Sequence, residues 1–252
     1  MHPDRIAELL TPFLGENFEN ADQASALEQS VTLTPAQLEN ISIYIDILLR
    51  WNSRINLTSV RLPEEIVTRH FGESLFAARH LFPIPRSAGS VRIGAAASQP
   101  GSPGIHVIDV GSGAGFPGLP IKIWDPDIHL TLIESNHKKG TFLREVVRAL
   151  RLTSVDVFTG RAADFQESQV QEHNKTAVQV GDVVTLRAVE HFDLALPEAA
   201  LLVRPSGCLA ILIGHGQVAR ARELVPSLHW DAPMKLPHSS SRFLIKGTNE
   251  SQ

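Results

Sequence analysis

A strand-like run that leads directly into a glycine-rich loop is the feature that most constrains how this chain can fold. Residues His106 to Val110 have the composition of a buried strand, and Gly111, Gly113 and Gly115 follow at alternate positions. Gly111 permits the sharp turn out of the strand, and Gly113 lets ligand atoms approach the backbone where a Cβ would block them. The pattern predicts a ligand-binding loop, with a purely structural glycine turn as the alternative.

The residues around this loop favour a nucleoside that carries no diphosphate. Phe116 stands where a dinucleotide-binding G-x-G-x-x-G would have its third glycine, and Pro117 and Pro120 give an irregular helix start that is poorly suited to a pyrophosphate. Glu134 ends the next apolar run, about 20 residues after the loop, where such folds place a carboxylate for the ribose hydroxyls. Asp109, on the strand before the loop, is expected to organise the loop amides rather than to act as a catalyst.

Strand-like and helical runs alternate from residue 106 onward. Further strands are predicted at 129–134, 155–158, 182–186 and 208–213, and a helix is predicted over 138–150. This alternation is typical of an α/β, Rossmann-like fold with a mainly parallel sheet covered on both faces. Residues 239–246 are expected to add an antiparallel C-terminal edge strand.

The residues before the sheet are expected to form an N-terminal helical extension. Thr34 and Gln37 can cap a helix reciprocally around Pro35, and apolar residues then recur at three- and four-residue spacing to residue 51 or 52. A second helix is predicted from Pro63 to about His80. The predicted organisation is therefore a helical extension over 1–83, a flexible connector rich in Pro, Gly, Ser and Ala over 84–105, and a core domain over 106–252.

Composition limits the class of protein. The formal net charge is −4, and no apolar run approaches the roughly 20 residues that a membrane-spanning helix needs. The single cysteine, Cys208, can form neither an internal disulfide nor a cysteine zinc site. We therefore expect a cytoplasmic protein with no membrane span and no metal. A basic stretch from His137 to Arg151, interrupted by Glu145 alone, is compatible with a solvated helix face and with a phosphate-facing patch.

A set of short motifs carries a more specific resemblance. Their residues are Arg50-Trp51-Asn52, Asn56-Leu57-Thr58, Arg69-His70, Glu73-Ser74, Asp109 to Gly118, Phe142-Leu143 and Arg187-Ala188. In this order, over roughly residues 35 to 215, the chain resembles the bacterial ribosomal RNA small-subunit methyltransferase G family, formerly called glucose-inhibited division protein B. The resemblance implies a class I methyltransferase fold and a monomeric cytoplasmic enzyme. It also implies methylation of guanine N7 in 16S ribosomal RNA of the small ribosomal subunit, with S-adenosyl-L-methionine as cofactor.

The resemblance also implies site residues. The implied cofactor-binding set, which includes two residues already predicted above, is Gly111, Gly113, Phe116, Glu134, Ala162, Ala163 and Arg187. For the two alanines, small residues at a strand-to-helix junction are the alternative. Arg69 and His70 are candidates for RNA contact, a satisfied core position being the alternative for His70, and Lys138 and Lys139 are candidates from the basic stretch. The chain departs from the family pattern in having Glu73 for the usual Asp, Ala163 for an acidic residue, and no Lys near Gly214.

The implied reaction needs no catalytic base. Guanine N7 carries an in-plane lone pair and no proton, so alignment of the reacting atoms and exclusion of water are the tasks of the protein. Arg187 is expected to act by position and charge rather than by proton transfer. Two other functions stay open on the sequence alone: a methyltransferase acting on a small molecule or a protein, and a non-catalytic RNA-binding protein that retains the fold.

Overall fold

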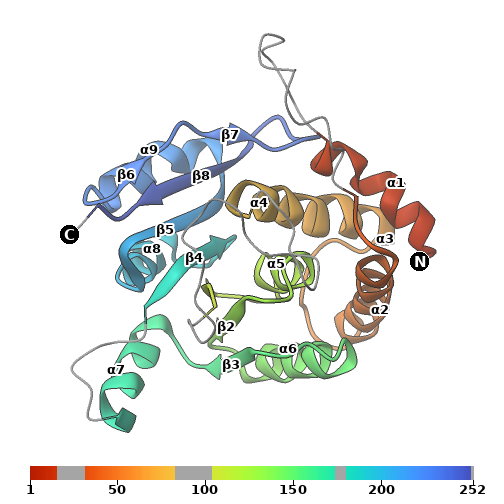
Figure 1. Ribbon diagram of the computed structural model, residues 1–252, viewed down its shortest axis with the longest axis horizontal. Helices are drawn as coiled ribbons and strands as arrows, with labels where there is room; N and C mark the ends of the chain where they lie inside the picture. Colours follow the sequence, from red (N-terminus) through yellow and green to blue (C-terminus); the bar gives the residue numbers. More distant parts are fainter. Residues whose placement is uncertain (16–31, 83–103, 174–179, 251–252) are drawn as a thin grey trace.

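The middle layer of the protein is a twisted sheet, seen in the computed structural model, which describes residues 1–15, 32–82, 104–173 and 180–250 (Figure 1). The sheet order within these residues is β3 (Val155–Thr159), β2 (His129–Glu134), β1 (His106–Val110), β4 (Gly181–Arg187), β5 (Val203–Gly214) and β8 (Arg242–Thr248). The first five are parallel and β8 is antiparallel to β5. Two short strands, β6 (His229–Trp230) and β7 (Met234–Lys235), pair with the other side of β8.

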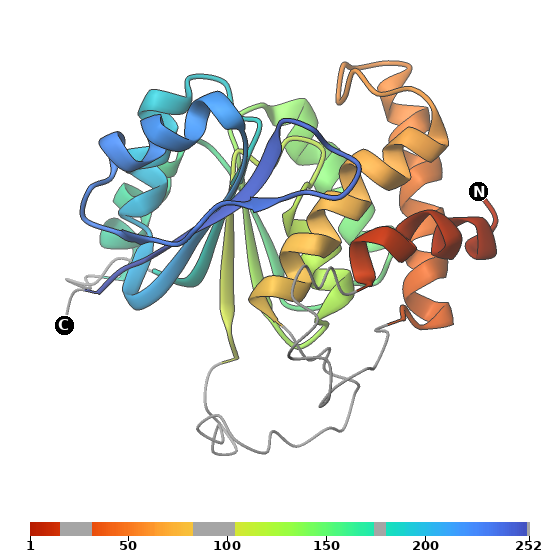
Figure 2. The same cartoon turned by 90° about the horizontal axis from the view of Figure 1, so that it is seen from above.

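Helices cover both faces of the sheet (Figure 2). One face carries α5 (Gly118–Trp124) and α6 (His137–Ala149), and the other carries α7 (Ala162–His173), α8 (Phe192–Ala200) and α9 (His215–Leu224). Successive strand residues divide between the faces, because side chains alternate along a strand. Val107 packs with α5 and α6, whereas Ile108 packs with α7 and α8. This arrangement confirms the predicted Rossmann-like α/β fold.

The N-terminal helices pack on the α5 and α6 face. They are α1 (Pro3–Leu14), α2 (Pro35–Asn52), α3 (Pro63–Ile66), η2 (Val67–Gly72) and α4 (Glu73–Leu81). The predicted capping box is present: Thr34 N donates to Gln37 Oε1 at 2.8 Å, and Gln37 N donates to Thr34 Oγ1 at 3.3 Å. Gln37 also donates through Nε2 to Ile123 O at 2.8 Å, which ties the start of α2 to α5.

Two predicted elements differ in detail from those observed. The helix predicted over residues 63–80 is interrupted by the π-helical turn η2, a feature that often marks functional sites and that apolar spacing does not reveal. The predicted antiparallel strand is present as β8, but β6 and β7 lie along its outer side, since these two-residue strands are too short to show a period. The connector predicted over 84–105 lies, except for its last two residues, outside the described residues. Among the helices that the structure describes, none has the length and apolar character needed to cross a membrane.

Candidate functional site

The glycine loop leaves the carboxyl end of β1 and turns past the end of β2. Gly111 and Gly113 have φ angles of +68° and +57°, in the left-handed region that residues with a Cβ rarely adopt. Gly111 N and Ser112 N donate to Ile133 O at 2.9 and 3.0 Å. A Cβ on Gly111 would meet Val189 Cγ1 at 2.6 Å, whereas a Cβ on Gly113 would meet nothing nearer than Gly111 O at 3.8 Å. Packing therefore requires the first glycine, and the second faces open space.

Glu134 joins this loop to the end of β2. Its carboxylate is buried, with Oε2 accepting from Gly113 N at 2.8 Å and Oε1 accepting from Asn136 N at 2.8 Å. Each oxygen has a second lone pair, so the carboxylate can still accept from a ligand hydroxyl. Gly160 N donates to Glu134 O at 3.1 Å, which brings the buried Ala162 and half-buried Ala163 at the start of α7 beside the same strand end.

Asp109 was expected to organise the amides of the glycine loop, but its carboxylate holds the first amide of α5 and a hydroxyl of β4. It is fully buried and accepts from Thr185 Oγ1 at 2.7 Å and from Gly118 N at 3.3 Å. Desolvation raises the pKa of Asp109 to about 6, although its hydrogen bonds act in the opposite direction. Both carboxylate oxygens of Asp109 are thus engaged by groups of the protein.

Phe116 is buried among aromatic rings. Tyr44 from α2 stacks on it at 5.4 Å between centroids with an interplanar angle of 1°, and His70 from η2 stacks on it at 4.8 Å and 26°. The Tyr44 hydroxyl also donates to Ala114 O in the glycine loop. Phe116 is only 7% exposed, so a ligand would meet little of its side chain. Tyr44 was missed by the sequence reasoning, although a lone tyrosine on an apolar stripe signals a buried hydroxyl that needs a partner.

Arg187 ends β4 and lies beside the enclosed ring, with its Cζ 6.0 Å from the Phe116 centroid. Nη2 donates to Arg69 O at 2.6 Å, and it lies 3.1 Å from His70 Nδ1 and 3.2 Å from Glu73 Oε2. Nη1 is buried and has no hydrogen-bond partner within the described parts of the chain. Since buried donors are almost always satisfied, this nitrogen indicates a place for an acceptor supplied by a ligand.

His70 is held as a neutral ring. Burial, and then the positive charges of Arg187, Arg69 and Arg242, lower the pKa of His70 to about 3. Nδ1 therefore accepts from Arg187, and Nε2, 2.7 Å from Thr58 Oγ1, carries the proton; we assign this tautomer from the hydrogen-bond network. These contacts favour the satisfied core position for His70, whereas the side chain of Arg69 is exposed.

The basic stretch forms α6, which begins next to Glu134. Asn136 caps this helix by accepting from Lys138 N at 2.9 Å and Lys139 N at 3.2 Å. The side chain of Lys138 is exposed and that of Lys139 is half-buried, at the same end of the sheet as the glycine loop. The position is compatible with RNA contact and with a solvated face, so both interpretations remain.

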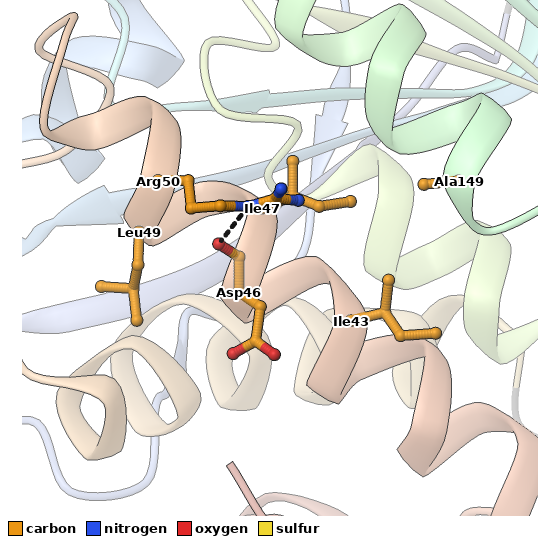
Figure 3. A pocket seen from close by; sticks show the side chains of 6 residues that line it. All are labelled: Ile43, Asp46, Ile47, Leu49, Arg50 and Ala149. Carbon is orange, nitrogen blue, oxygen red and sulfur yellow. Dashed lines mark hydrogen bonds between the residues drawn. The ribbon is translucent and has the colours of Figure 1, made fainter.

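A cavity of about 640 Å³ lies away from these residues, between α2 and α6 (Figure 3). Its lining is Ile43, Asp46, Ile47, Leu49, Arg50 and Ala149. The polar contact drawn there is local to α2, where Arg50 Nε donates to Asp46 O at 3.4 Å. The cavity contains no predicted site residue. Within the described residues, no group of three or more His, Cys, Asp or Glu side chains could hold a metal ion.

Comparison with known proteins identifies the family. The family described as "GidB: rRNA small subunit methyltransferase G" matches residues 37–225. A ribosomal RNA small subunit methyltransferase G of Bacillus subtilis is 34% identical over 73% of this chain and 67% of its own length. The protein of the same name from Roseiflexus castenholzii is 34% identical over 87% of this chain and 86% of its own length.

The matched segment contains every residue of the predicted cofactor and RNA sets, from Arg69 to Arg187. The resemblance inferred from the short motifs is therefore confirmed, as is the prediction of a methyltransferase. The chain belongs to the ribosomal RNA small subunit methyltransferase G family.

Proposed function

We propose that this protein transfers the methyl group of S-adenosyl-L-methionine to N7 of a guanine in 16S ribosomal RNA of the small ribosomal subunit. The observation that carries the proposal is the convergence of three groups at the carboxyl ends of β1, β2 and β4. They are the open side of Gly113, the carboxylate of Glu134 and Nη1 of Arg187, which has no partner among the described residues. Ligand sites of open α/β sheets lie at these strand ends.

The residues present fit the cofactor. Gly111 and Gly113 hold the backbone that approaches it, Glu134 accepts from its ribose hydroxyls, and Arg187 Nη1 donates to its carboxylate, which meets the need of a buried donor for an acceptor. Ala162 and Ala163 at the start of α7 leave room for the adenine, and Phe116 contributes through its backbone. When bound, the cofactor supplies an electrophilic methyl group carried on a sulfonium.

The residues of the pocket orient the substrates and move no proton. His70 is neutral, with Nδ1 taken by Arg187 and Nε2 by Thr58. Asp109 holds Thr185 and Gly118 instead of facing a substrate. Because N7 needs no deprotonation, a site without a free base suits this acceptor, and rate enhancement comes from alignment and from exclusion of water.

RNA contact is assigned to the cations near the pocket. Arg69 is exposed on η2, next to Arg187, and Lys138 and Lys139 lie at the start of α6, next to Glu134. His70 follows Arg69 on η2 and contacts Arg187, so it supports this surface indirectly. We further propose that the enzyme acts as a monomer in the cytoplasm, which a single cysteine suits.

Labelled S-adenosyl-L-methionine tests this proposal directly. The purified protein is incubated with 16S ribosomal RNA or with small subunits, and the modified base is mapped. We expect label on a guanine at N7. Label transferred to a small molecule or a protein, with none on RNA, would contradict the substrate, and failure to bind the cofactor in calorimetry would contradict the reaction itself.

A further inference from the structure

A buried carboxylate joins two arginines that come from different strands. Glu73 begins α4, and its side chain is only 2% exposed. Oε2 pairs with Arg187 Nη2 at 3.2 Å, and Oε1 pairs with Arg242 Nη1 at the start of β8. Because Arg242 lies opposite Gly214 at the end of β5, both arginines stand at the end of the sheet that carries the glycine loop.

The contacts of Arg187 are divided unequally between its two terminal nitrogens. Nη2 faces three acceptors, Arg69 O, His70 Nδ1 and Glu73 Oε2, whereas Nη1 has no partner in the described residues. A guanidinium is planar and rigid, so fixing Nη2 also fixes the direction in which Nη1 donates. Glu73 is the charged acceptor of the three, and charge-assisted hydrogen bonds are the stronger kind.

The group of arginines around Glu73 carries more positive charge than the carboxylate neutralises. Burial raises the pKa of Glu73, while Arg187, Arg242 and Arg69 act in the opposite direction. Arg242 is 29% exposed and Arg69 is exposed, so the positive charge extends from the buried Arg187 to the surface. On a protein whose net charge is −4, such a local excess favours contact with an anionic partner.

We propose that Glu73 is a positioning residue that orients Arg187 toward the cofactor and Arg242 toward the RNA. It holds Arg187 with Nη1 turned to the methyl donor, and it holds the partly exposed Arg242 at the same end of the sheet, where Arg242 binds a phosphate of the RNA. The identity of the polyanion rests on the proposed function; the role of Glu73 toward Arg187 does not.

The first arm of the test measures cofactor affinity without RNA. Calorimetry with S-adenosylhomocysteine compares wild type, Glu73→Gln and Glu73→Asp. We expect Glu73→Gln to weaken binding by about tenfold, because the charged partner of Arg187 is lost, and Glu73→Asp to recover most of that loss. The free energy of unfolding is measured alongside. Unchanged affinity of a folded Glu73→Gln protein, with stability alone reduced, would overturn the positioning role.

The second arm measures binding to 16S ribosomal RNA as a function of salt. Arg242→Met is expected to weaken binding and to reduce the salt dependence by about one unit of slope, the amount expected for one lost phosphate contact, with S-adenosylhomocysteine affinity within twofold of wild type. Arg204→Met is the matched control, because Arg204 is also an ion-paired arginine, 2.6 Å from Asp182, but lies at the opposite end of the sheet.

Each failure has a separate meaning. Equal RNA binding by Arg242→Met and Arg204→Met would overturn the role of Arg242, also in the case that Glu73→Gln does not fold. If the wild-type protein bound no RNA, the proposed substrate and the phosphate contact of Arg242 would both be wrong. The calorimetric arm would then still decide whether Glu73 positions Arg187 for the cofactor.

Discussion

Gly113 combines a left-handed backbone conformation with open space on the side where a Cβ would project. We expect Gly113→Val to abolish binding of S-adenosylmethionine, because the added side chain enters the ligand space, and to cost about 1–3 kcal/mol of stability through backbone strain. Calorimetry and denaturant unfolding measure the two effects. Gly216→Val is the control, since a Cβ there meets nothing within 4 Å and the backbone φ is ordinary. Measurable affinity in a folded Gly113→Val protein would contradict the assignment of this space.

Glu134 holds two backbone amides, and we propose that it also binds the ribose of the cofactor. One substitution affects both roles, so the sizes of the changes in stability and in affinity tell them apart. In Glu134→Ala, the amides of Gly113 and Asn136 lose their acceptor, so the loop is destabilised and the proposed ribose contact is lost as well. We expect cofactor binding to weaken by about 1–3 kcal/mol, the range for a lost charge-assisted hydrogen bond. Titration calorimetry measures this value. A loss in unfolding free energy with unchanged affinity would leave Glu134 as a support of the loop alone.

His70 makes stability depend on pH in a defined direction. Its pKa of about 3 in the folded protein is below the usual 6.5, so between these values the unfolded chain binds the proton and the folded protein does not. Stability should therefore rise with pH through this window, by up to about 1.4 kcal/mol per pH unit from this group. Denaturant unfolding of wild type and His70→Gln from pH 4.5 to 7.5 tests it. Equal slopes for both proteins would show that His70 protonates freely in the fold.

At the scale of elements, α2 contacts the glycine loop of the proposed cofactor site through Tyr44. Tyr44→Phe keeps the ring that stacks on Phe116 and removes the hydroxyl that donates to Ala114 O. We expect cofactor affinity to fall several-fold, because a buried carbonyl of the loop is left without its donor, which costs about 1–3 kcal/mol spread over folding and binding. Calorimetry at a temperature where both proteins are folded measures it.

The matched control lies on the same helix. The ring centroid of Trp51 lies 5.8 Å from that of Phe142 in α6. We expect Trp51→Phe to leave cofactor affinity unchanged. If Tyr44→Phe bound the cofactor as tightly as Trp51→Phe does, α2 would support the fold and have no influence on the loop.

The elements that the sequence predicts well are those set by local pattern. The capping box at Thr34 and the strand that leads into Gly111 each follow from a few neighbouring residues. The π-helical turn η2 does not, because the apolar spacing of residues 63–80 suits an ordinary helix equally well. The short strands β6 and β7 depend on β8 for their pairing partners, so their own residues carry no signal. Helix α1 repeats apolar residues at Ile6, Leu10 and Phe13, a stripe that would have predicted it.

The same distinction between local pattern and tertiary contact applies to the residues of the proposed site. Gly113 and Glu134, which the structure brings into contact, could be proposed from the sequence because the spacing of a strand, a glycine loop and an acid is itself a signal. Tyr44 and Arg242 could not, because each meets the pocket through tertiary contacts with residues far away in the chain. A sequence records which residues are present, whereas these contacts depend on how α2 and β8 pack.

For the whole molecule, the distribution of charge matters more than its sum. The net charge of −4 opposes binding to RNA in general, so we propose that affinity comes from local cations such as Lys138 and Lys139. We expect Lys138→Ala combined with Lys139→Ala to weaken RNA binding and to reduce its salt dependence by up to about two units of slope, with cofactor affinity unchanged. Filter binding over a salt series measures the slope. An unaltered slope would mean that these lysines lie on a solvated helix face and do not contact RNA.

The ion group around Glu73 has a consequence for the chain during its synthesis. Glu73 leaves the ribosome long before Arg187, and Arg187 before Arg242, yet all three meet in the finished protein. A nascent chain that ends before β8 contains the glycine loop and Glu134 but lacks the second cation for a carboxylate that folding would bury. Desolvating that carboxylate with one partner missing is costly, so the start of α4 should reach its final burial only after the last strand has been made.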